Sequence, residues 1–199
     1  MATPPESTSV EPATSSKVLP RFLSALAQHP TPVLLDLGPV VGANIAFFGE
    51  RLACKIYVED LFADVEAHAR RADRDEVPLD LAGRLNQPDA SVDGILCWDL
   101  FDYLEKPTAQ ALAAKLVSLL RPGGAVYAFF GAKAGDLAHY TRFVLESEDA
   151  LRQRPYPATP RKRQVFVVRD INKMFDGLVV AESVLLAKTS TRETLFRKP

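Results

Sequence analysis

The chain has 199 residues, of which 47% are hydrophobic and 25% are charged, a composition typical of a globular domain in water. Its formal net charge is −1, whereas a nucleic-acid-binding protein usually carries a basic excess. The two cysteines, Cys54 and Cys97, are too few for a disulfide framework or a four-thiolate zinc site, so we expect no bound metal. No apolar run reaches the roughly 18 residues that a membrane-spanning helix needs.

Residues 1–16 are almost entirely Pro, Ser, Thr, Glu and Ala, with Val10 as the one branched aliphatic side chain. Such a segment buries too little apolar surface to offset the entropy of ordering. We therefore expect a disordered tail over residues 1–16 and one domain over residues 17–199. The tail lacks the basic start and apolar stretch of a secretory signal and the arginines of a transit peptide, so the expected location is cytoplasmic.

Hydrophobic periodicity predicts strands that alternate with helices from Lys17 onward. The expected helices cover residues 18–27, 43–52, 61–71 and 108–120. The expected strands are the short apolar runs 33–37, 55–58, 77–81, 93–98 and 125–130. This alternation favours right-handed crossovers. The predicted fold class is therefore α/β, a Rossmann-like doubly wound domain whose mostly parallel sheet has helices on both faces.

The pattern after Phe130 is less regular. It predicts, in chain order, a helix, a basic loop with three prolines, a strand and a short helix, over residues 136–151, 152–164, 165–168 and 171–175. The last two apolar segments, residues 178–188 and 193–197, are expected to close the fold as a C-terminal antiparallel strand pair.

The loop after the first long strand is the first place to expect a ligand, because open α/β sheets bind ligands at the carboxyl ends of their strands. Residues 36–42 read DLGPVVG, and the two glycines let the backbone approach a ligand closely. A phosphate-binding loop would need Gly-Lys-Ser/Thr, and a dinucleotide loop would need a glycine where Val40 stands. A nucleoside joined to a charged amino acid needs instead an acid for its ammonium group, and Asp36 is placed to provide one.

With this loop the chain resembles the class I S-adenosylmethionine-dependent methyltransferases, particularly the small ones that consist of the catalytic domain alone. The first motif of that family is an apolar strand, an acid, an aliphatic residue and G-x-G-x-G. Asp36, Gly38 and Gly42 match this motif, and Val40 departs from it.

Two further segments support the resemblance. Residues 85–93 resemble the run by which the family enters its fourth strand, although Asn86 and Gln87 depart from it. Residues 119–127, LLRPGGAVY, resemble the turn into its fifth strand. The resemblance covers about residues 31–130, or half of the chain.

The resemblance implies S-adenosylmethionine as the cofactor and assigns roles to acids at the strand ends. Asp36 would meet the ammonium group, Glu59 or Asp60 the ribose hydroxyls, Asp80 the adenine amino group, and the backbone of Leu81 the adenine ring. The implied cofactor-binding residues are Asp36, Gly38, Pro39, Gly42, Glu59, Asp60, Asp80, Leu81, Trp98 and Asp99. The implied acceptor-binding residues are Asp102, Tyr103, His139 and Tyr140. No catalytic residue is implied, because methyl transfer from a sulfonium mainly requires alignment of the acceptor.

Each candidate also has a purely structural explanation. The two loop glycines would serve a tight turn, and Glu59 and Asp60 would cap the helix that follows them. Asp80 would be an ordinary surface acid. Trp98 would be shared between the core and a pocket wall, and Cys97 would be a small buried hydrophobe.

We therefore expect S-adenosylmethionine-dependent methyl transfer to an unidentified small-molecule acceptor. One alternative is a catalytically inactive methyltransferase-like protein with a binding or regulatory role, which Val40 favours. Another is an RNA or protein methyltransferase that uses the basic segment between Arg152 and Arg163. Residues 98–101, WDLF, replace the Asn-Pro-Pro-Tyr motif of enzymes that methylate base amino groups, so we expect no nucleic-acid partner. A nicotinamide-dependent enzyme is disfavoured by the first loop, and the oligomeric state is left open.

Overall fold

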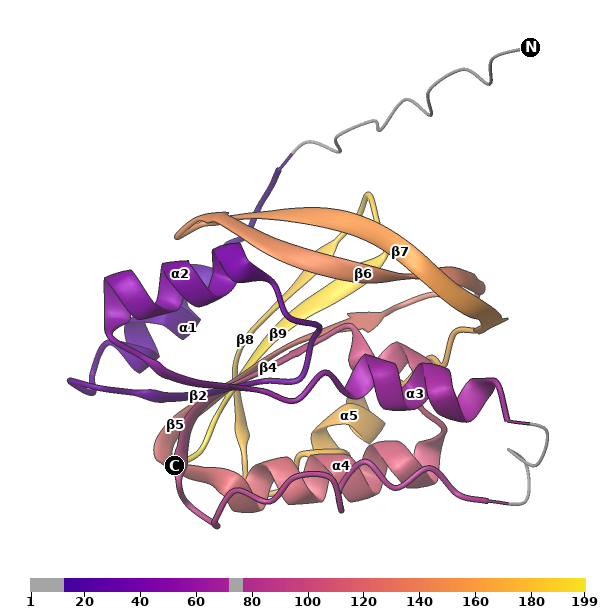
Figure 1. The fold of residues 1–199 in the computed structure, drawn as a ribbon, viewed down its shortest axis with the longest axis horizontal. Helices are drawn as coiled ribbons and strands as arrows, with labels where there is room; N and C mark the ends of the chain where they lie inside the picture. Colours follow the sequence, from indigo (N-terminus) through magenta and orange to yellow (C-terminus); the bar gives the residue numbers. More distant parts are fainter. Residues whose placement is uncertain (1–12, 72–76) are drawn as a thin grey trace.

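A six-stranded sheet forms the centre of the molecule, with strand order β3-β2-β4-β5-β9-β8 (Figure 1). The computed structural model describes residues 13–71 and 77–199. A second, three-stranded sheet with order β1-β7-β6 lies over the end of the central sheet at the top of the view. No helix in the described ranges is long and apolar enough to cross a membrane.

The parallel half of the central sheet contains four strands: β2 (Val33–Asp36), β3 (Lys55–Val58), β4 (Val92–Trp98) and β5 (Leu120–Gly131). Strand β2 pairs in parallel with β3 and β4, and β4 pairs in parallel with β5. Every residue of β4 is buried, as expected for a central strand covered on both faces. The helices are α1 (Leu19–Leu26), α2 (Gly42–Leu52), α3 (Leu61–Ala69), α4 (Lys106–Leu119) and α5 (Val168–Met174), with a short 3₁₀ helix, η1, at Leu100–Tyr103.

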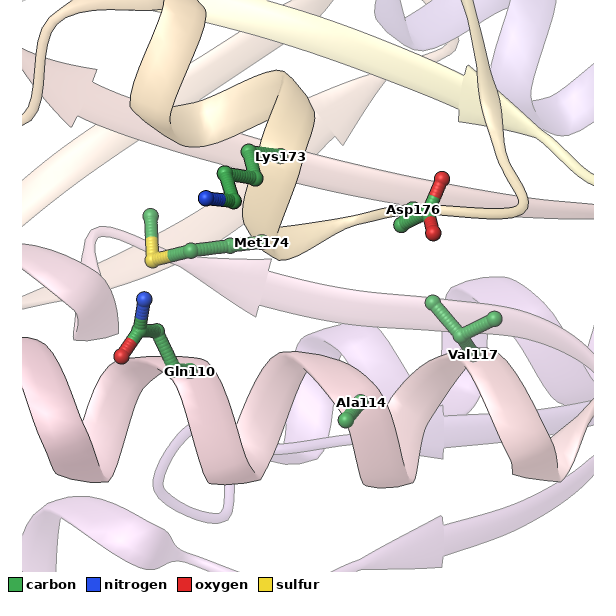
Figure 2. A pocket seen from close by; sticks show the side chains of 6 residues that line it. All are labelled: Gln110, Ala114, Val117, Lys173, Met174 and Asp176. Carbon is green, nitrogen blue, oxygen red and sulfur yellow. The ribbon is translucent and has the colours of Figure 1, made fainter.

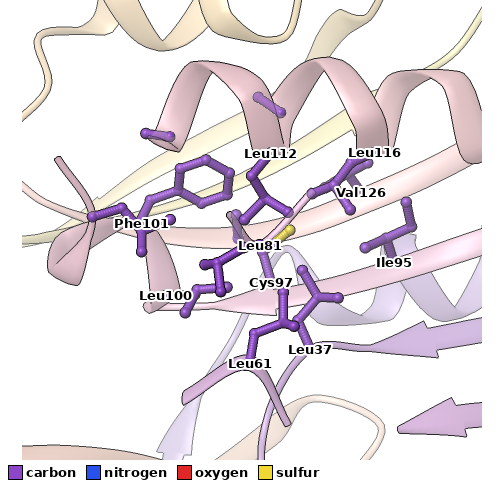
Figure 3. Packing of buried hydrophobic residues seen from close by; sticks show 14 of the residues in the cluster. Leu37, Leu61, Leu81, Ile95, Cys97, Leu100, Phe101, Leu112, Leu116 and Val126 are labelled. Atoms are coloured by element: carbon purple, nitrogen blue, oxygen red, sulfur yellow. The ribbon is translucent and has the colours of Figure 1, made fainter. Parts of the chain in front are cut away.

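Helices cover both faces of the central sheet, which confirms the doubly wound α/β expectation. Helices α1 and α2 lie on one face, and α3, α4 and α5 lie on the other (Figure 1). Successive residues of a strand point to opposite faces, so Leu34 packs in the cluster with α1 while Leu35 packs in the cluster with α3 and α4. Figure 3 shows the second cluster, in which Leu112 and Leu116 of α4 lie over Ile95 and Val126.

The C-terminal antiparallel pair is confirmed as β8 (Val179–Leu186) and β9 (Thr191–Arg197). Strand β9 also pairs antiparallel with β5, which joins the pair to the parallel half of the sheet. The start of the chain is fastened to this region. Ser16 is buried, accepts the N–H of Leu19 (2.8 Å) and donates to Glu193 of β9. Residues 1–12 of the expected tail lie outside the described residues, whereas β1 (Thr14–Ser15) pairs with β7.

The strand predicted over residues 77–81 is wrong. This segment is irregular, with bends at Val77 and Leu81, and a turn follows it at residues 82–84. Pro78 has no N–H to donate to a ladder, and Asp80 Oδ1 accepts the backbone N–H of Gly83 (2.8 Å), which favours a turn. Strand β3 is consequently the edge of the central sheet on this side.

The helix predicted over residues 136–151 and the loop predicted over residues 152–164 are also wrong. The chain forms a long antiparallel hairpin of β6 (Asp136–Ser147) and β7 (Ala150–Lys162), which we call the cover hairpin. Strand β1 reaches only Leu151 and its neighbour, so the three prolines of β7 lie where it is an edge strand and tolerates them. The strand predicted over residues 165–168 is not formed, because this stretch leads into α5, the short helix expected at 171–175.

One buried amide ties the cover hairpin to helix α2. Asn44 Nδ2 donates to the carbonyl of Phe143 (2.8 Å), and Asn44 Oδ1 accepts the N–H of Leu145 (2.9 Å). The side chain therefore satisfies two buried backbone groups of β6, as a neighbouring strand would.

Replacing Asn44 with alanine should destabilise the fold by about 2 kcal/mol or more, because both backbone groups of β6 lose their partner while they stay buried. The free energy of unfolding in urea measures the loss. The matched control is Asn86→Ala, since Asn86 is exposed and bonds only the carbonyl of Arg84 at 3.3 Å. An equal loss of unfolding free energy in both variants would contradict the role of Asn44 in joining α2 to β6.

Candidate functional site

The carboxyl ends of three parallel strands meet at one place. Asp36, the last residue of β2, is paired in register with Val58 of β3 and Leu96 of β4. The backbone N–H of Glu59, directly after β3, donates to the carbonyl oxygen of Asp36 (2.9 Å). The sheet therefore brings Asp36, Glu59 and the end of β4 together, as the loop motif predicts.

The carboxylate of Asp36 is buried and satisfied from within the protein. Its Oδ1 accepts the backbone N–H of Gly38 (2.9 Å) and the indole N–H of Trp98 (2.7 Å). Burial raises the pKa of Asp36 to about 6, although both hydrogen bonds act in the opposite direction. The nearby charge of Asp60 adds to the rise. Asp36 is thus an acid whose charge is poorly compensated by its present donors.

Glu59 is half-buried and faces the segment that leads into β4. Its Oε1 accepts from Nε2 of Gln87 (2.5 Å), while Oε1 of Gln87 is buried and has no hydrogen-bond partner among the described residues. Asp60 precedes α3 with a left-handed backbone (φ +42°) and makes no side-chain capping bond. The structure therefore does not support helix capping as the role of Asp60.

Asp80 does not join this cluster through its side chain. It is exposed and is engaged by the Gly83 N–H in the turn described above. Leu81 is buried in the core cluster with α3 and α4. These are the two residues expected near an adenine ring, Asp80 through its side chain and Leu81 through its backbone.

The two ends of the 36–42 loop differ in the space above them. A Cβ placed on Gly38 would lie 2.6 Å from Cδ1 and 2.7 Å from Nε1 of Trp98, so the indole covers this residue. A Cβ placed on Gly42 would meet no atom within 4 Å. Pro39 lies between them, half-buried, and Val40 is 64% exposed.

The residues expected on the acceptor side mostly fasten the cover hairpin. Asp102 accepts the N–H of Gly131 (2.7 Å) and pairs with Arg163 (3.1 Å). Tyr103 donates its hydroxyl to the carbonyl of His139 (2.9 Å). Tyr140 donates its own to Glu66 of α3 (2.9 Å), and His139 is exposed.

Asp99 and Tyr156 are different, because each keeps a buried oxygen that has no hydrogen-bond partner within residues 13–71 and 77–199. Burial raises the pKa of Asp99 to about 8, and the neighbouring Asp102 adds to the rise. Burial, together with the charges of Asp60 and Asp99, also raises the pKa of Tyr156. Tyr156 was missed from the sequence, because it lies between prolines in a segment expected to be a loop.

The basic segment that follows is used within the protein. Ion pairs join Arg152 to Glu146 (3.0 Å) and Arg161 to Glu66 (3.8 Å). Lys162 pairs with Asp136, in addition to the pair between Arg163 and Asp102. Its side chains are therefore largely neutralised by acids of the same chain.

Two pockets lie away from the strand ends. One of about 350 Å³ lies between α4 and α5 and is lined by Gln110, Ala114, Val117, Lys173, Met174 and Asp176 (Figure 2). The other, of about 250 Å³, is lined by residues of α1 and α2 together with Glu148. Neither includes a residue of the 36–42 loop.

Residues 35–128 match the family model described as a methyltransferase domain, a range that begins in β2 and ends in β5. These residues form a class I methyltransferase domain. The matched range contains the 36–42 loop, Glu59 and the exit of β4, so the cluster described above lies inside it.

Solved methyltransferase structures share the fold of this class I domain. The chain is 13% identical to an S-adenosylmethionine-dependent methyltransferase from Clostridium acetobutylicum, with a TM-score of 0.55 over 93% of this chain and 92% of that one. It is 18% identical to 1,6-didemethyltoxoflavin-N1-methyltransferase from Burkholderia thailandensis, with a TM-score of 0.54 over 92% of this chain and 77% of that one. It is 16% identical to the CcbJ methyltransferase from Streptomyces caelestis, with a TM-score of 0.53 over 91% of this chain and 94% of that one. No curated protein sequence matches the chain.

Raised carboxyl pKa values make the stability of the methyltransferase domain pH-dependent. Burial raises the pKa of Asp36 and of Asp102 to about 6 and that of Asp99 to about 8. Each value exceeds that of the unfolded chain, so the stability these groups contribute is complete below about pH 4 and is lost as pH rises through 6 and 8. The melting temperature should fall between pH 5 and pH 9.

Differential scanning fluorimetry across this range measures the trend. Asp99→Asn should flatten the curve between about pH 5 and pH 8, because over this range the folded wild type keeps a proton on Asp99 that the unfolded chain has lost. Asp136→Asn, at an exposed position, is the control and should follow the wild-type curve. A melting temperature that rises toward pH 9 would contradict the assignment.

Proposed function

We propose that this protein binds S-adenosylmethionine at the carboxyl ends of β2, β3 and β4 and transfers its methyl group to a small-molecule acceptor. The observation that carries the proposal is the meeting of Asp36 and Glu59 at adjacent strand ends, on either side of one backbone hydrogen bond. Two acids in this position suit a ligand that offers both an ammonium group and ribose hydroxyls.

The chemistry of the available donors and acceptors fits this cofactor. When bound, S-adenosylmethionine supplies an electrophilic methyl group on a sulfonium. Asp36 would accept from its ammonium group and Glu59 from its ribose, with Asp60 next to Glu59. The unpartnered Oε1 of Gln87 is a further acceptor beside Glu59. The remaining residues proposed to line the cofactor are Gly38, Pro39, Gly42, Asp80, Leu81 and Asp99, and Trp98 lies beside them at the end of β4.

The protein's part in the reaction would be to align the acceptor and to exclude water. The cover hairpin supports this role, because Tyr140 and Phe143 of β6 are buried against the strand ends. Asp99 and Tyr156 each offer a buried, unpartnered oxygen under this hairpin. With a pKa of about 8, Asp99 is mostly protonated at pH 7 and is suited to donate a hydrogen bond to an acceptor molecule.

A small acceptor is favoured over a macromolecule for two reasons. The enzyme from B. thailandensis, which shares the fold, was crystallised with 1,6-didemethyltoxoflavin and S-adenosylhomocysteine. The segment between Arg152 and Arg163, which an RNA would use, has most of its charges paired with acids of the same chain. A residue set for the acceptor would comprise Asp99, Asp102, Tyr103, His139, Tyr140 and Tyr156.

One observation favours a second candidate, a methyltransferase-like protein without catalysis. The indole N–H of Trp98 already donates to Oδ1 of Asp36, the carboxylate that an ammonium group would need. If that contact were permanent, the domain would serve as a binding or regulatory module.

Calorimetric titration with S-adenosylmethionine and S-adenosylhomocysteine separates the two candidates. We expect binding at micromolar Kd, equivalent to about −8 kcal/mol. Glu59→Ala should weaken binding about tenfold or more, because a carboxylate that accepts two hydroxyl hydrogen bonds contributes more than 1.4 kcal/mol. The matched control is Glu50→Ala, an exposed acid on α2 away from the strand ends. Absence of heat and of thermal shift with both ligands would favour the second candidate.

A further inference from the structure

The side chain of Trp98 fills the space above the first glycine of the loop. The indole is 2% exposed. Its Cδ1 and Nε1 atoms lie 2.6 and 2.7 Å from the position that a Cβ on Gly38 would take. Its N–H donates to Asp36 Oδ1 at 2.7 Å. A hydrogen-bond donor of the protein thus already occupies Oδ1 of Asp36, the carboxylate proposed to meet the ammonium group of the cofactor.

Aromatic side chains of the neighbouring strands hold the indole from its other side. The ring of Phe143, on β6, stacks on Trp98 with centroids 5.1 Å apart and planes 5° apart. Phe143 stacks in turn on Phe129 of β5 at 4.9 Å and 9°. Asn44 fixes the backbone of Phe143 on helix α2. The position of the indole is therefore coupled to the position of the cover hairpin.

Two features oppose this arrangement. The backbone of Trp98 is left-handed (φ +52°), a conformation that costs a non-glycine residue free energy. Asp36 is buried, and within the described part of the chain two N–H donors reach one of its oxygens, so its charge is poorly compensated there. A ligand with a full positive charge would satisfy Asp36 better than the neutral indole does.

We propose that Trp98 is an internal occupant of the cofactor cradle, and that S-adenosylmethionine binds only after the indole leaves Gly38. The proposal rests on the function proposed above. It makes cofactor affinity the product of an intrinsic affinity and the fraction of molecules in which the indole is displaced. Any partner or acceptor that lifts the cover hairpin would raise cofactor affinity by the same coupling.

The placement of the indole is testable without any ligand, because Trp98 is the one tryptophan of the chain. Gly38→Ala places a methyl group inside the indole ring's contact distance, so the ring must move. The tryptophan emission should shift to longer wavelength and its quenching constant with acrylamide should rise several-fold. Gly42→Ala is the matched control, since the same methyl group on the same loop meets no atom within 4 Å. Its emission and quenching should equal those of wild type.

Cofactor binding tests the consequence. Trp98→Leu keeps an apolar side chain and removes the indole, so S-adenosylmethionine should bind about tenfold or more tightly than to wild type. Phe143→Leu removes the stacking partner without touching the loop, and it should act in the same direction if Trp98→Leu fails to fold. In wild type, titration with S-adenosylmethionine should shift the tryptophan emission to longer wavelength as the indole is displaced.

The possible failures are distinguishable. If Gly38→Ala and Gly42→Ala give the same emission and quenching, the indole does not cover Gly38 and the proposal is overturned. If wild type, Trp98→Leu and Phe143→Leu bind S-adenosylmethionine equally, the internal occupant is overturned while the proposed function stands. If none of the three binds it, the proposed function fails and displacement by cofactor fails with it, whatever the fluorescence of the glycine variants.

Discussion

The hydrogen bond from the indole of Trp98 to Asp36 fixes most of what surrounds the strand ends. A carboxylate buried at the end of a central strand needs donors, and the loop supplies one N–H, from Gly38. The second comes from Trp98, which has a left-handed backbone at the end of β4. The ring of Trp98 stacks on Phe143, so this contact joins the end of β4 to β6.

The cover hairpin, which lies outside the matched residues 35–128, is held by helices on both faces of the central sheet. Asn44 of α2 bonds the backbone of β6 from one side. Glu66 of α3 accepts two hydrogen bonds from Thr159 of β7 and one from Tyr140 on the other. Burial would raise the pKa of Glu66, but these bonds and Arg70 outweigh it and lower the pKa to about 2, so Glu66 stays charged. The cover hairpin is therefore hydrogen-bonded to one helix on each face of the sheet.

The parallel half of the central sheet and the 36–42 loop could be predicted from local sequence patterns. The cover hairpin could not, because its structure depends on contacts between residues far apart in the chain. Short apolar runs and glycines mark β2, β4 and the 36–42 loop and led to Asp36, whereas Glu59 was indicated by the family resemblance. The helix predicted over residues 136–151 was wrong because apolar residues three and four positions apart are not unique to helices. They also occur on β6, a strand with irregular pairing that is covered on one face. The three prolines of residues 150–162 indicate a loop in the sequence, and only the structure shows that β7 is an edge strand where they lie. The partner of Trp98 depends on a backbone angle that no sequence pattern encodes.

The departure from the glycine motif at Val40 carries less weight than the sequence alone gives it. Val40 is 64% exposed at the turn of the loop, so its side chain points to solvent and obstructs nothing in this conformation. The need for glycine is concentrated at Gly38, where any Cβ would collide with the indole. What separates this domain from an open cofactor cradle is therefore the residue at the end of β4 and not the altered motif. Gly38 is needed because the indole of Trp98 lies against it. The proposed cofactor and Trp98 therefore compete for the carboxylate of Asp36.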